Sequence, residues 1–263
     1  MIPTPTRAGK FVLQTALTIL VAPFFLVLFA AVQQSFQGAG PWENYLTVLR
    51  VPGLFGFFWN SVQIAAWTVL LTYIAAILAA FALAKLRVVG REVVYLVLVL
   101  ALALPPVILT VPLFVTMQRL GLFDSLWSVI LPLTALSVPL SVILARGFIA
   151  GIPDELFDAA KIDGASTVRV FWHIVLPLAR PVSAVMCIWT FVLAWNEYLL
   201  PLLFLQSPAK QTVTLLPTYF IGQYGSDYTK ISAASVMIAL PTIVFYLATQ
   251  KYFERGMLGG MSR

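Results

Sequence analysis

The sequence predicts an all-α membrane protein with six transmembrane helices, on two observations. Of its 263 residues, 61% are hydrophobic and only 10% are charged, and the mean hydropathy is +0.96. Soluble domains are roughly 45–50% apolar and about 25% charged. The second observation is that six segments are apolar over the roughly 20 residues that a helix needs to cross a hydrocarbon core. These segments are 11–32, 61–84, 93–117, 126–145, 182–205 and 231–253.

The first span follows Arg7 and Lys10, as the apolar part of a secretory signal follows its basic start. Its apolar run of about 22 residues is longer than the 7–15 residues of a signal's hydrophobic region. Cleavage would also leave five spans and place the two termini on opposite sides of the membrane. We therefore expect this segment to be retained as a span.

Lysine and arginine are unevenly distributed between the two sides of the predicted spans, which sets their orientation. One side carries only four of the sixteen: Arg50, Arg119, Lys210 and Lys230. The other twelve lie near the N-terminus, after spans two and four, and in the tail. This asymmetry places both termini in the cytoplasm, together with the loop at 149–178. It also accounts for the net charge of +6 without a nucleic-acid partner.

The connections between spans are too short for an independent domain, so residues 1–263 are predicted to form one membrane domain. The single cysteine, Cys187, excludes an internal disulfide, and the single histidine, His173, offers no metal-binding spacing. The chain has no GxxxxGK[ST] phosphate loop. We therefore expect a transport protein that is not itself an enzyme and binds no cofactor.

Residues 152–177, IPDELFDAAKIDGASTVRVFWHIVLP, hold four of the ten acidic residues. Pro153 suits the first position of a helix. Gly164 is placed to end that helix in a left-handed turn. Ser166 or Thr167 can then cap a second helix, which is expected to stop before Pro177. The segment is predicted to be a helix–turn–helix on the cytoplasmic side.

The first of these two helices presents small residues, because Leu156, Ala159 and Ala160 share one face. Small residues let the surface of another protein approach closely, so the helix is suited to docking a cytoplasmic partner. A second interpretation fits the local sequence equally well: an amphipathic helix that only packs under its own bundle.

The order Asp158-Ala159-Ala160, then Gly164, then Ile-x-Leu-Pro ending at Pro177 resembles the EAA loop of ABC importer permeases. Asp158 stands where that pattern usually has Glu. Further similar stretches are IPDELFDAAKIDGAS at 152–166, NSVQIA at 60–65, WNEYLLPLL at 195–203 and the tail ERGMLGGMSR at 254–263. They extend the resemblance over nearly the whole chain and direct it to the carbohydrate-uptake branch, and there to the smaller permease of maltose-type transporters.

The resemblance implies the MetI-like fold of type I ABC importer permeases and a place in a bacterial inner membrane. It implies half of a translocation pathway for a sugar or oligosaccharide. The implied partners are a second homologous permease, an ATPase dimer that holds ATP and Mg, an extracytoplasmic solute-binding protein and membrane lipid. The segment 152–177 would couple to the ATPase through the motif and flanking residues Glu155, Asp158, Ala159, Ala160, Asp163 and Gly164.

Polar side chains near the external ends of two spans are candidates for the substrate pathway. Glu197 is the only acid inside a predicted span, and polar groups in a membrane are costly and often functional. Asn196 and Tyr198 adjoin it, and Asn60 opens span two. Structural hydrogen bonding or capping is the alternative for these residues.

Two other segments carry weaker predictions. Span three contains Pro105, Pro106 and Pro112, which are expected to break the helix and either line a cavity or shape its packing. The external segment 206–230 is a candidate contact for a binding protein, or else a solvated linker. Its candidate contact residues are Tyr219, Gln223, Tyr224 and Asp227.

Three alternatives stay open. Within the same class, the solute could be glycerol phosphate or another polyol-like compound, although no predicted span interior holds the Arg or Lys that a phosphate favours. An ion-coupled secondary transporter would need ionisable relays and internal repeats, neither of which the spans show. An intramembrane enzyme would need a nucleophile and a base that converge, and His173 has no such partner.

Overall fold

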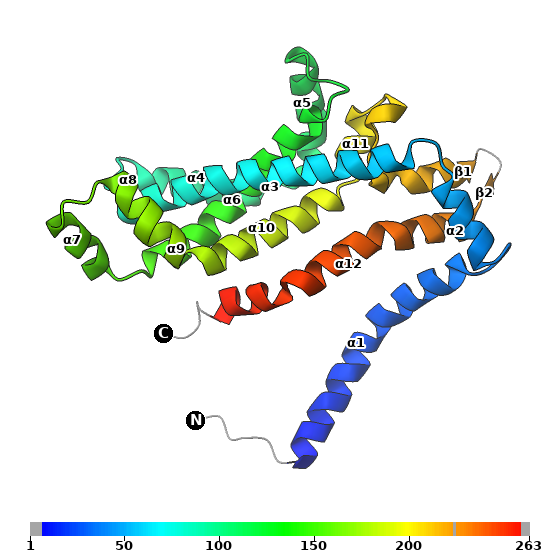
Figure 1. Cartoon of the computed structure of the whole chain (residues 1–263), viewed down its shortest axis with the longest axis horizontal. Coiled ribbons are helices and arrows are strands. Elements are labelled where there is room, and N and C mark those ends of the chain that lie inside the picture. Colours follow the sequence, from blue (N-terminus) through cyan, green and yellow to red (C-terminus); the bar gives the residue numbers. More distant parts are fainter. Residues whose placement is uncertain (1–6, 223–224, 259–263) are drawn as a thin grey trace. The chain divides into compact units, whose positions relative to one another are not determined.

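A computed structural model describes residues 7–222 and 225–258, and the side chains of 9–222 and 225–250 (Figure 1). Within these residues all regular secondary structure is helical apart from one small β-hairpin. The elements in chain order are α1 (Arg7–Ser35), α2 (Pro41–Leu49), α3 (Leu54–Lys85), α4 (Arg91–Leu102), α5 (Pro106–Arg119), α6 (Trp127–Ala150), α7 (Asp154–Ile162), α8 (Thr167–Val170), the π-helical turn η1 (Phe171–Val175), α9 (Leu176–Leu178), α10 (Arg180–Trp195), α11 (Leu199–Phe204), the 3₁₀ turns η2 (Pro208–Lys210) and η3 (Val213–Phe220), β1 (Ile221–Gly222), β2 (Gly225–Ser226) and α12 (Tyr228–Leu258).

Four helices in the described part of the chain are long and apolar enough to cross a membrane, and the number of spans is six when each of two bent helix pairs is counted as one span. The four are α1, α3, α6 and α12, which confirm the predicted spans one, two, four and six. The fold class predicted from the sequence, an all-α membrane protein with six spans, is therefore correct.

The third predicted span, 93–117, is not one helix. It consists of α4 and α5, which meet at a bend of 103°, and Figure 1 shows α5 turned away from the direction of α4. Pro105 has an extended backbone and Pro106 opens α5. A residue that precedes a proline is driven out of the helical region, so the consecutive prolines break the helix as expected.

The fifth predicted span, 182–205, was expected as a single helix, and this was wrong. The helix α10 ends at Trp195, and α11 begins only at Leu199. On its other side α10 is preceded by the residues Thr167–Leu178, which form with it the second bent pair, at 74°. The part of the chain predicted as a cytoplasmic loop thus supplies half of this pair.

The chain forms two compact units. The first comprises Met1–Pro52 and Leu216–Leu240. Its described part is held by Asn44, which is fully buried and whose Nδ2 donates to the carbonyl oxygens of Ser35 at 2.9 Å and Gln37 at 2.7 Å. The hydroxyl of Thr229 donates to Oδ1 of the same Asn44 at 3.4 Å. One amide therefore ties the end of α1 to the start of α12.

The second unit comprises Gly53–Leu215 and Pro241–Arg263. Within it, α3 packs along α6 and α10 (Figure 1). Ala76 and Ala80 of α3 and Ala145 of α6 are fully buried, and small side chains let membrane helices approach closely. The same apolar cluster includes Phe157 and Phe171, so the loop at 149–178 packs on the ends of the transmembrane helices.

Candidate functional site

The helix α7 forms where the sequence predicts it and carries Asp154 and Glu155 in its first turn. Acidic side chains are favourable there because the N-terminus of a helix carries a partial positive charge. Pro153 is the residue that caps α7 rather than its first helical residue. The expectation for Pro153 was therefore wrong by one position.

Gly164 ends α7 in the predicted left-handed conformation, with φ at 72°. Its N–H donates to the carbonyl of Lys161 at 3.0 Å, and the N–H of Ala165 donates to the carbonyl of Ala160 at 2.9 Å. These two bonds together form a Schellman motif, which satisfies carbonyls that a helix end leaves unpaired.

The second helix of the loop, α8, is capped by Ser166, whose hydroxyl accepts the N–H of Arg169 at 3.3 Å. The expectation that this helix stops before Pro177 was wrong. A π-helical turn, Phe171–Val175, precedes the proline, and α9 continues through it to Leu178. Pro177 follows this π-helical turn and is the second residue of α9.

The two faces of α7 differ from the predicted ones. Phe157 and Ala160 are each 8% exposed and belong to the apolar core. Ala160 therefore does not share a free face with Ala159. The exposed side of α7 carries Glu155, Asp158, Ala159 and Ile162, which follow the i, i+3, i+4, i+7 spacing of one helix face. We call these four residues the docking face.

Charges on the two sides of α7 have different surroundings. Asp154 lies 2.6 Å from Nζ of Lys85, and a hydrogen bond from this ammonium lowers the pKa of the Asp154 carboxyl. Asp158 pairs with Lys161 at 2.8 Å, one turn along α7, and both side chains are largely exposed. Exposed ion pairs of this kind stabilise a fold little, so Asp158 is available to a partner. Asp163, at the end of α7, is also exposed.

The candidate pathway residues Asn196, Glu197 and Tyr198 lie at the break between α10 and α11. The Nδ2 of Asn196 donates to the carbonyl of Val192 at 2.8 Å. The Oε1 of Glu197 accepts the N–H of Leu200 at 2.9 Å. Both side chains thus satisfy backbone groups at helix ends, while Tyr198 is 42% exposed.

Asn60 is nearly buried and fastens the external segment to α3. Its Nδ2 donates to the carbonyls of Ala209 and Gln211, both at 2.9 Å. The next residue, Ser61, accepts the N–H of Val213 at 2.9 Å. The structure brings Asn60 next to residues 209–213, and the hydroxyl of Thr214, the next residue, donates to the carbonyl oxygen of Glu197 at 2.8 Å.

The candidate contacts for a binding protein surround the hairpin. Tyr219 is 44% exposed and precedes β1. Asp227 caps α12, because its Oδ1 accepts the N–H groups of Thr229 and Lys230, each at 3.2 Å. The side chain of Lys230 also pairs with it at 2.7 Å, and the hydroxyl of Thr229 donates to it at 2.6 Å. These two side chains and the N–H of Lys230 lower the pKa of Asp227 to about 2. Gln223 and Tyr224 lie outside the described residues.

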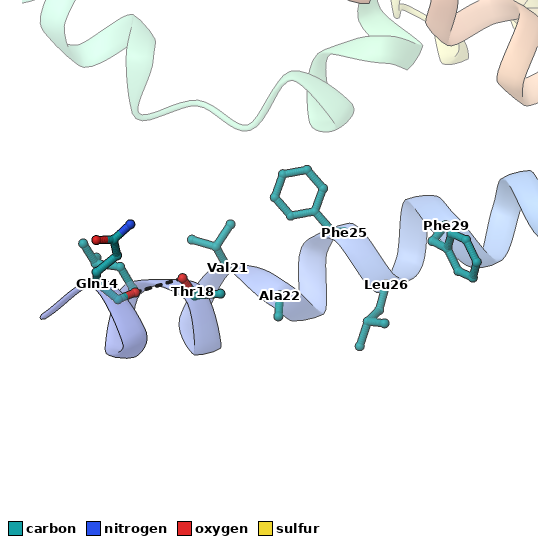
Figure 2. A pocket seen from close by; sticks show the side chains of 8 residues that line it. Gln14, Thr18, Val21, Ala22, Phe25, Leu26 and Phe29 are labelled. Carbon is teal, nitrogen blue, oxygen red and sulfur yellow. Dashed lines mark hydrogen bonds between the residues drawn. The ribbon is translucent and has the colours of Figure 1, made fainter. Parts of the chain in front are cut away.

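Two hollows in the surface have apolar linings. One, of about 260 Å³, lies against α5 and α6 and is lined in part by Pro112, Pro132 and Pro139. The other, about 700 Å³, runs along α1 between Gln14 and Phe29 (Figure 2). The hydroxyl of Thr18 there donates to the carbonyl of Gln14 at 2.9 Å. This hollow is one face of a single helix without converging polar groups, unlike a small-molecule site.

In the described part of the chain, no three His, Cys, Asp or Glu side chains lie close enough together to bind a metal ion.

Comparison with known proteins gives the family. The family described as the binding-protein-dependent transport system inner membrane component matches residues 72–258. The chain belongs to this family. The permease is 32% identical to the melibiose/raffinose/stachyose import permease protein MelC of Bacillus subtilis, over 97% of this chain and 98% of that one. It is 35% identical to the lactose transport system permease protein LacG of Rhizobium radiobacter, over 78% and 74% of the two chains.

A solved structure agrees on the fold. A chain of a bacterial ABC transporter involved in the import of the acidic polysaccharide alginate superimposes on the permease with a TM-score of 0.76. The alignment covers 95% of the permease and 99% of that chain, at 22% identity. The MetI-like fold implied by the sequence motifs is therefore confirmed.

Sequence reasoning missed Asp124, in the short turn between α5 and α6. Its Oδ1 accepts the N–H groups of Gln206 at 2.9 Å and Ser207 at 3.0 Å, and its Oδ2 accepts the Ser207 hydroxyl. Lys210 donates to the backbone carbonyl of Asp124 and pairs with its carboxylate at 3.2 Å. Asp124 and Lys210 are 86 residues apart, so no local signal could have connected them.

Proposed function

We propose that the permease forms half of the pathway of a bacterial ABC importer for a sugar or oligosaccharide. The family match supports a binding-protein-dependent system and not an ion-coupled secondary transporter. Relatives named for melibiose, raffinose, stachyose and lactose support the solute class. No step of ATP hydrolysis is assigned to this chain, since it lacks a phosphate loop.

The observation that carries the coupling part of the proposal is the build of α7. Its docking face points to solvent, while Phe157 and Ala160 hold its other face in the core. One face of this short helix is fixed in the core, and the exposed face has an alanine at its centre. A small side chain there allows a partner protein to approach the helix backbone closely. Ile162, 87% exposed, adds apolar surface to that face. Glu155 and Asp158 supply charges that basic residues of the ATPase would pair with.

The other partners follow from the same proposal. A second homologous permease completes the pathway, and an ATPase dimer with ATP and Mg docks on α7 in the cytoplasm. The asymmetry of lysine and arginine supports this orientation, with both termini on the same side as α7. An extracytoplasmic binding protein would deliver the solute to the external segment 206–230. The uncovered apolar face of α1 in Figure 2 suits lipid or the second permease.

Co-purification of the ATPase from membranes tests the docking face. We expect Ala159→Trp to lower the amount of bound ATPase by at least about tenfold, because a large side chain at the centre of a small-residue contact overpacks it. Val89→Trp is the matched control. Val89 lies in the loop after α3, is 98% exposed and has no role in the proposed contact. Retention of the ATPase by both variants would show that α7 docks by another face or not at all.

Uptake measurements with the reconstituted importer test the proposed class of solute. Melibiose, raffinose and lactose would be offered with the cognate binding protein, and glycerol phosphate would be the competitor that represents the alternative solute. Uptake of a sugar, unaffected by an excess of glycerol phosphate, is the expected result. Transport of glycerol phosphate alone would overturn the solute class without affecting the coupling proposal.

A further inference from the structure

Lys85 is the last residue of α3, and its side chain connects this transmembrane helix to the start of α7. Its Nζ donates to the carbonyl oxygen of Ile152 at 2.6 Å, to Oδ1 of Asp154 at 2.6 Å and to the carbonyl oxygen of Ala150 at 3.4 Å. An ammonium has three N–H donors, so each donor finds an acceptor. The Lys85 side chain is only 9% exposed.

The acceptors of Lys85 lie at the ends of two further helices and, for Ile152, in the short connection between them. Ala150 is the last residue of α6, and Asp154 is the first residue of α7. Carbonyls at a helix C-terminus lack partners within the helix and favour a nearby cation. The ring of Phe157 lies 4.7 Å from Nζ and adds a cation–π contact. A single cation therefore joins the ends of α3, α6 and α7.

Apolar contacts also hold α7 against the membrane helices, and they pass through Phe157 and Ala160. Apolar burial is not directional, so it allows a helix to rotate or slide while staying packed. Hydrogen bonds to a charged group depend steeply on distance and angle. The contacts of Lys85 therefore fix the register of α7 against α3, which the apolar contacts do not.

We infer that Lys85 is a positioning residue for energy coupling. Because Lys85 links the two helices, a displacement of α7 also moves α3. Movement of a docked ATPase is thereby transmitted to the helices of the translocation pathway. The inference rests on the proposed function and adds a residue behind α7, on the side away from the docking face. Its removal leaves the docking face intact and lets α7 move without moving α3. ATP is then hydrolysed with less solute imported.

The test uses the whole importer in proteoliposomes, with the second permease, the ATPase subunits and the binding protein. Lys85→Met keeps most of the apolar stem of the side chain and removes its cation. Arg87→Met is the matched control. Arg87 lies two residues further along, is exposed, and has no partner among the described residues. The measured quantity is the number of ATP molecules hydrolysed per solute imported.

We expect Lys85→Met to raise this ratio about tenfold through loss of uptake, since hydrogen bonds to charged groups are worth about that factor or more. Lys85→Arg, which keeps the charge, should recover most of the coupling, and Arg87→Met should match the wild type. An unchanged ratio in Lys85→Met would overturn the inference. A loss of ATPase binding equal to the loss of uptake would overturn it too, because Lys85 would then support docking rather than transmission.

A cross-link keeps the inference testable if Lys85→Met does not assemble. Lys85→Cys and Asp154→Cys, in a Cys187→Ser background, can be joined by a short bis-methanethiosulfonate linker. The number of ATP molecules hydrolysed per solute imported should be low with the linker in place and should rise after the linker is reduced. The same number before and after reduction would refute the role of Lys85. If the wild-type permease binds no ATPase, the proposed function fails. If it couples normally and the Lys85 variants do too, only this inference fails.

Discussion

The loop at 149–178 and the segment 206–230 are predicted to lie on opposite sides of the membrane, and we keep the names cytoplasmic loop and external segment for them. Both are polar connections, but they are held by different kinds of contact. Gly164 and Ser166 organise the cytoplasmic loop through bonds to residues three or four positions away. The external segment is fastened by Asn60, 151 residues from Gln211, and by Asp124, 86 residues from Lys210.

The two regions therefore differ in how firmly each is attached to the membrane helices. Local contacts let the loop keep its own shape, while its position on the membrane helices depends on buried apolar side chains such as Phe157 and Phe171 and on Lys85. Long-range polar contacts make the segment 206–213 part of the frame formed by α3, α5 and α6. The movable part of the external segment is then to be sought nearer the hairpin than at residues 206–213.

The strongest way to break the cytoplasmic loop is at Gly164. Gly164→Pro cannot adopt φ of 72° and removes the N–H that bonds to Lys161. We expect a local cost of about 3 kcal/mol or more and loss of solute uptake. Gly164→Asn is the control, since Asn tolerates the left-handed region, and it should keep most of the uptake. Uptake by proteoliposomes measures both, and wild-type transport by Gly164→Pro would contradict the coupling role of the loop.

The same comparison explains which features could be predicted from the sequence. The end of α7 at Gly164, the cap at Ser166 and the four unbroken spans follow from local composition and conformation. The role of Asp124 does not, because its partners meet it only in the folded chain. The break after Trp195 was missed although the side-chain bonds of Asn196 and Glu197 beside it are local. The burial of Ala160 was also missed. The i, i+3, i+4 pattern identifies a face of α7, and only the packing of Phe157 beside it shows which face is inward.

Lowering the pH should weaken the attachment of the external segment, because it protonates the carboxylate of Asp124. Hydrogen bonds from the hydroxyl and N–H of Ser207, and from Lys210 and Gln206, lower the pKa of this carboxyl from 3.8 to about 2. Its folded pKa is below its unfolded value, so its stabilisation is complete above pH 3.8 and is lost as the pH falls toward 2. We expect amide exchange protection at Ser207 to decrease over that window.

Asp124→Asn should remove this pH dependence and weaken the segment by about 1 kcal/mol at neutral pH, the usual contribution of a hydrogen bond. Thr116→Val, which removes only the bond from its hydroxyl to the carbonyl of Pro112 on α5, is the control. Amide exchange followed by mass spectrometry reports both changes. Protection at Ser207 that is identical in the wild type and in Asp124→Asn at every pH would show that Asp124 does not hold the segment.

The smallest effect is expected at Asp158, on the exposed face of α7. Asp158→Glu lengthens the acid by one methylene, which restores the residue that the family pattern usually has. The side chain is 65% exposed and its ion pair with Lys161 is solvated, so the free energy of unfolding should change by less than about 0.5 kcal/mol. Any change in uptake therefore reports the fit to the ATPase and not the stability of the loop. If Asp158→Glu changed the thermal midpoint as much as Gly164→Pro, then Asp158 would belong to the inner supports of α7, and the division of this helix into a docking face and a packed face would be wrong.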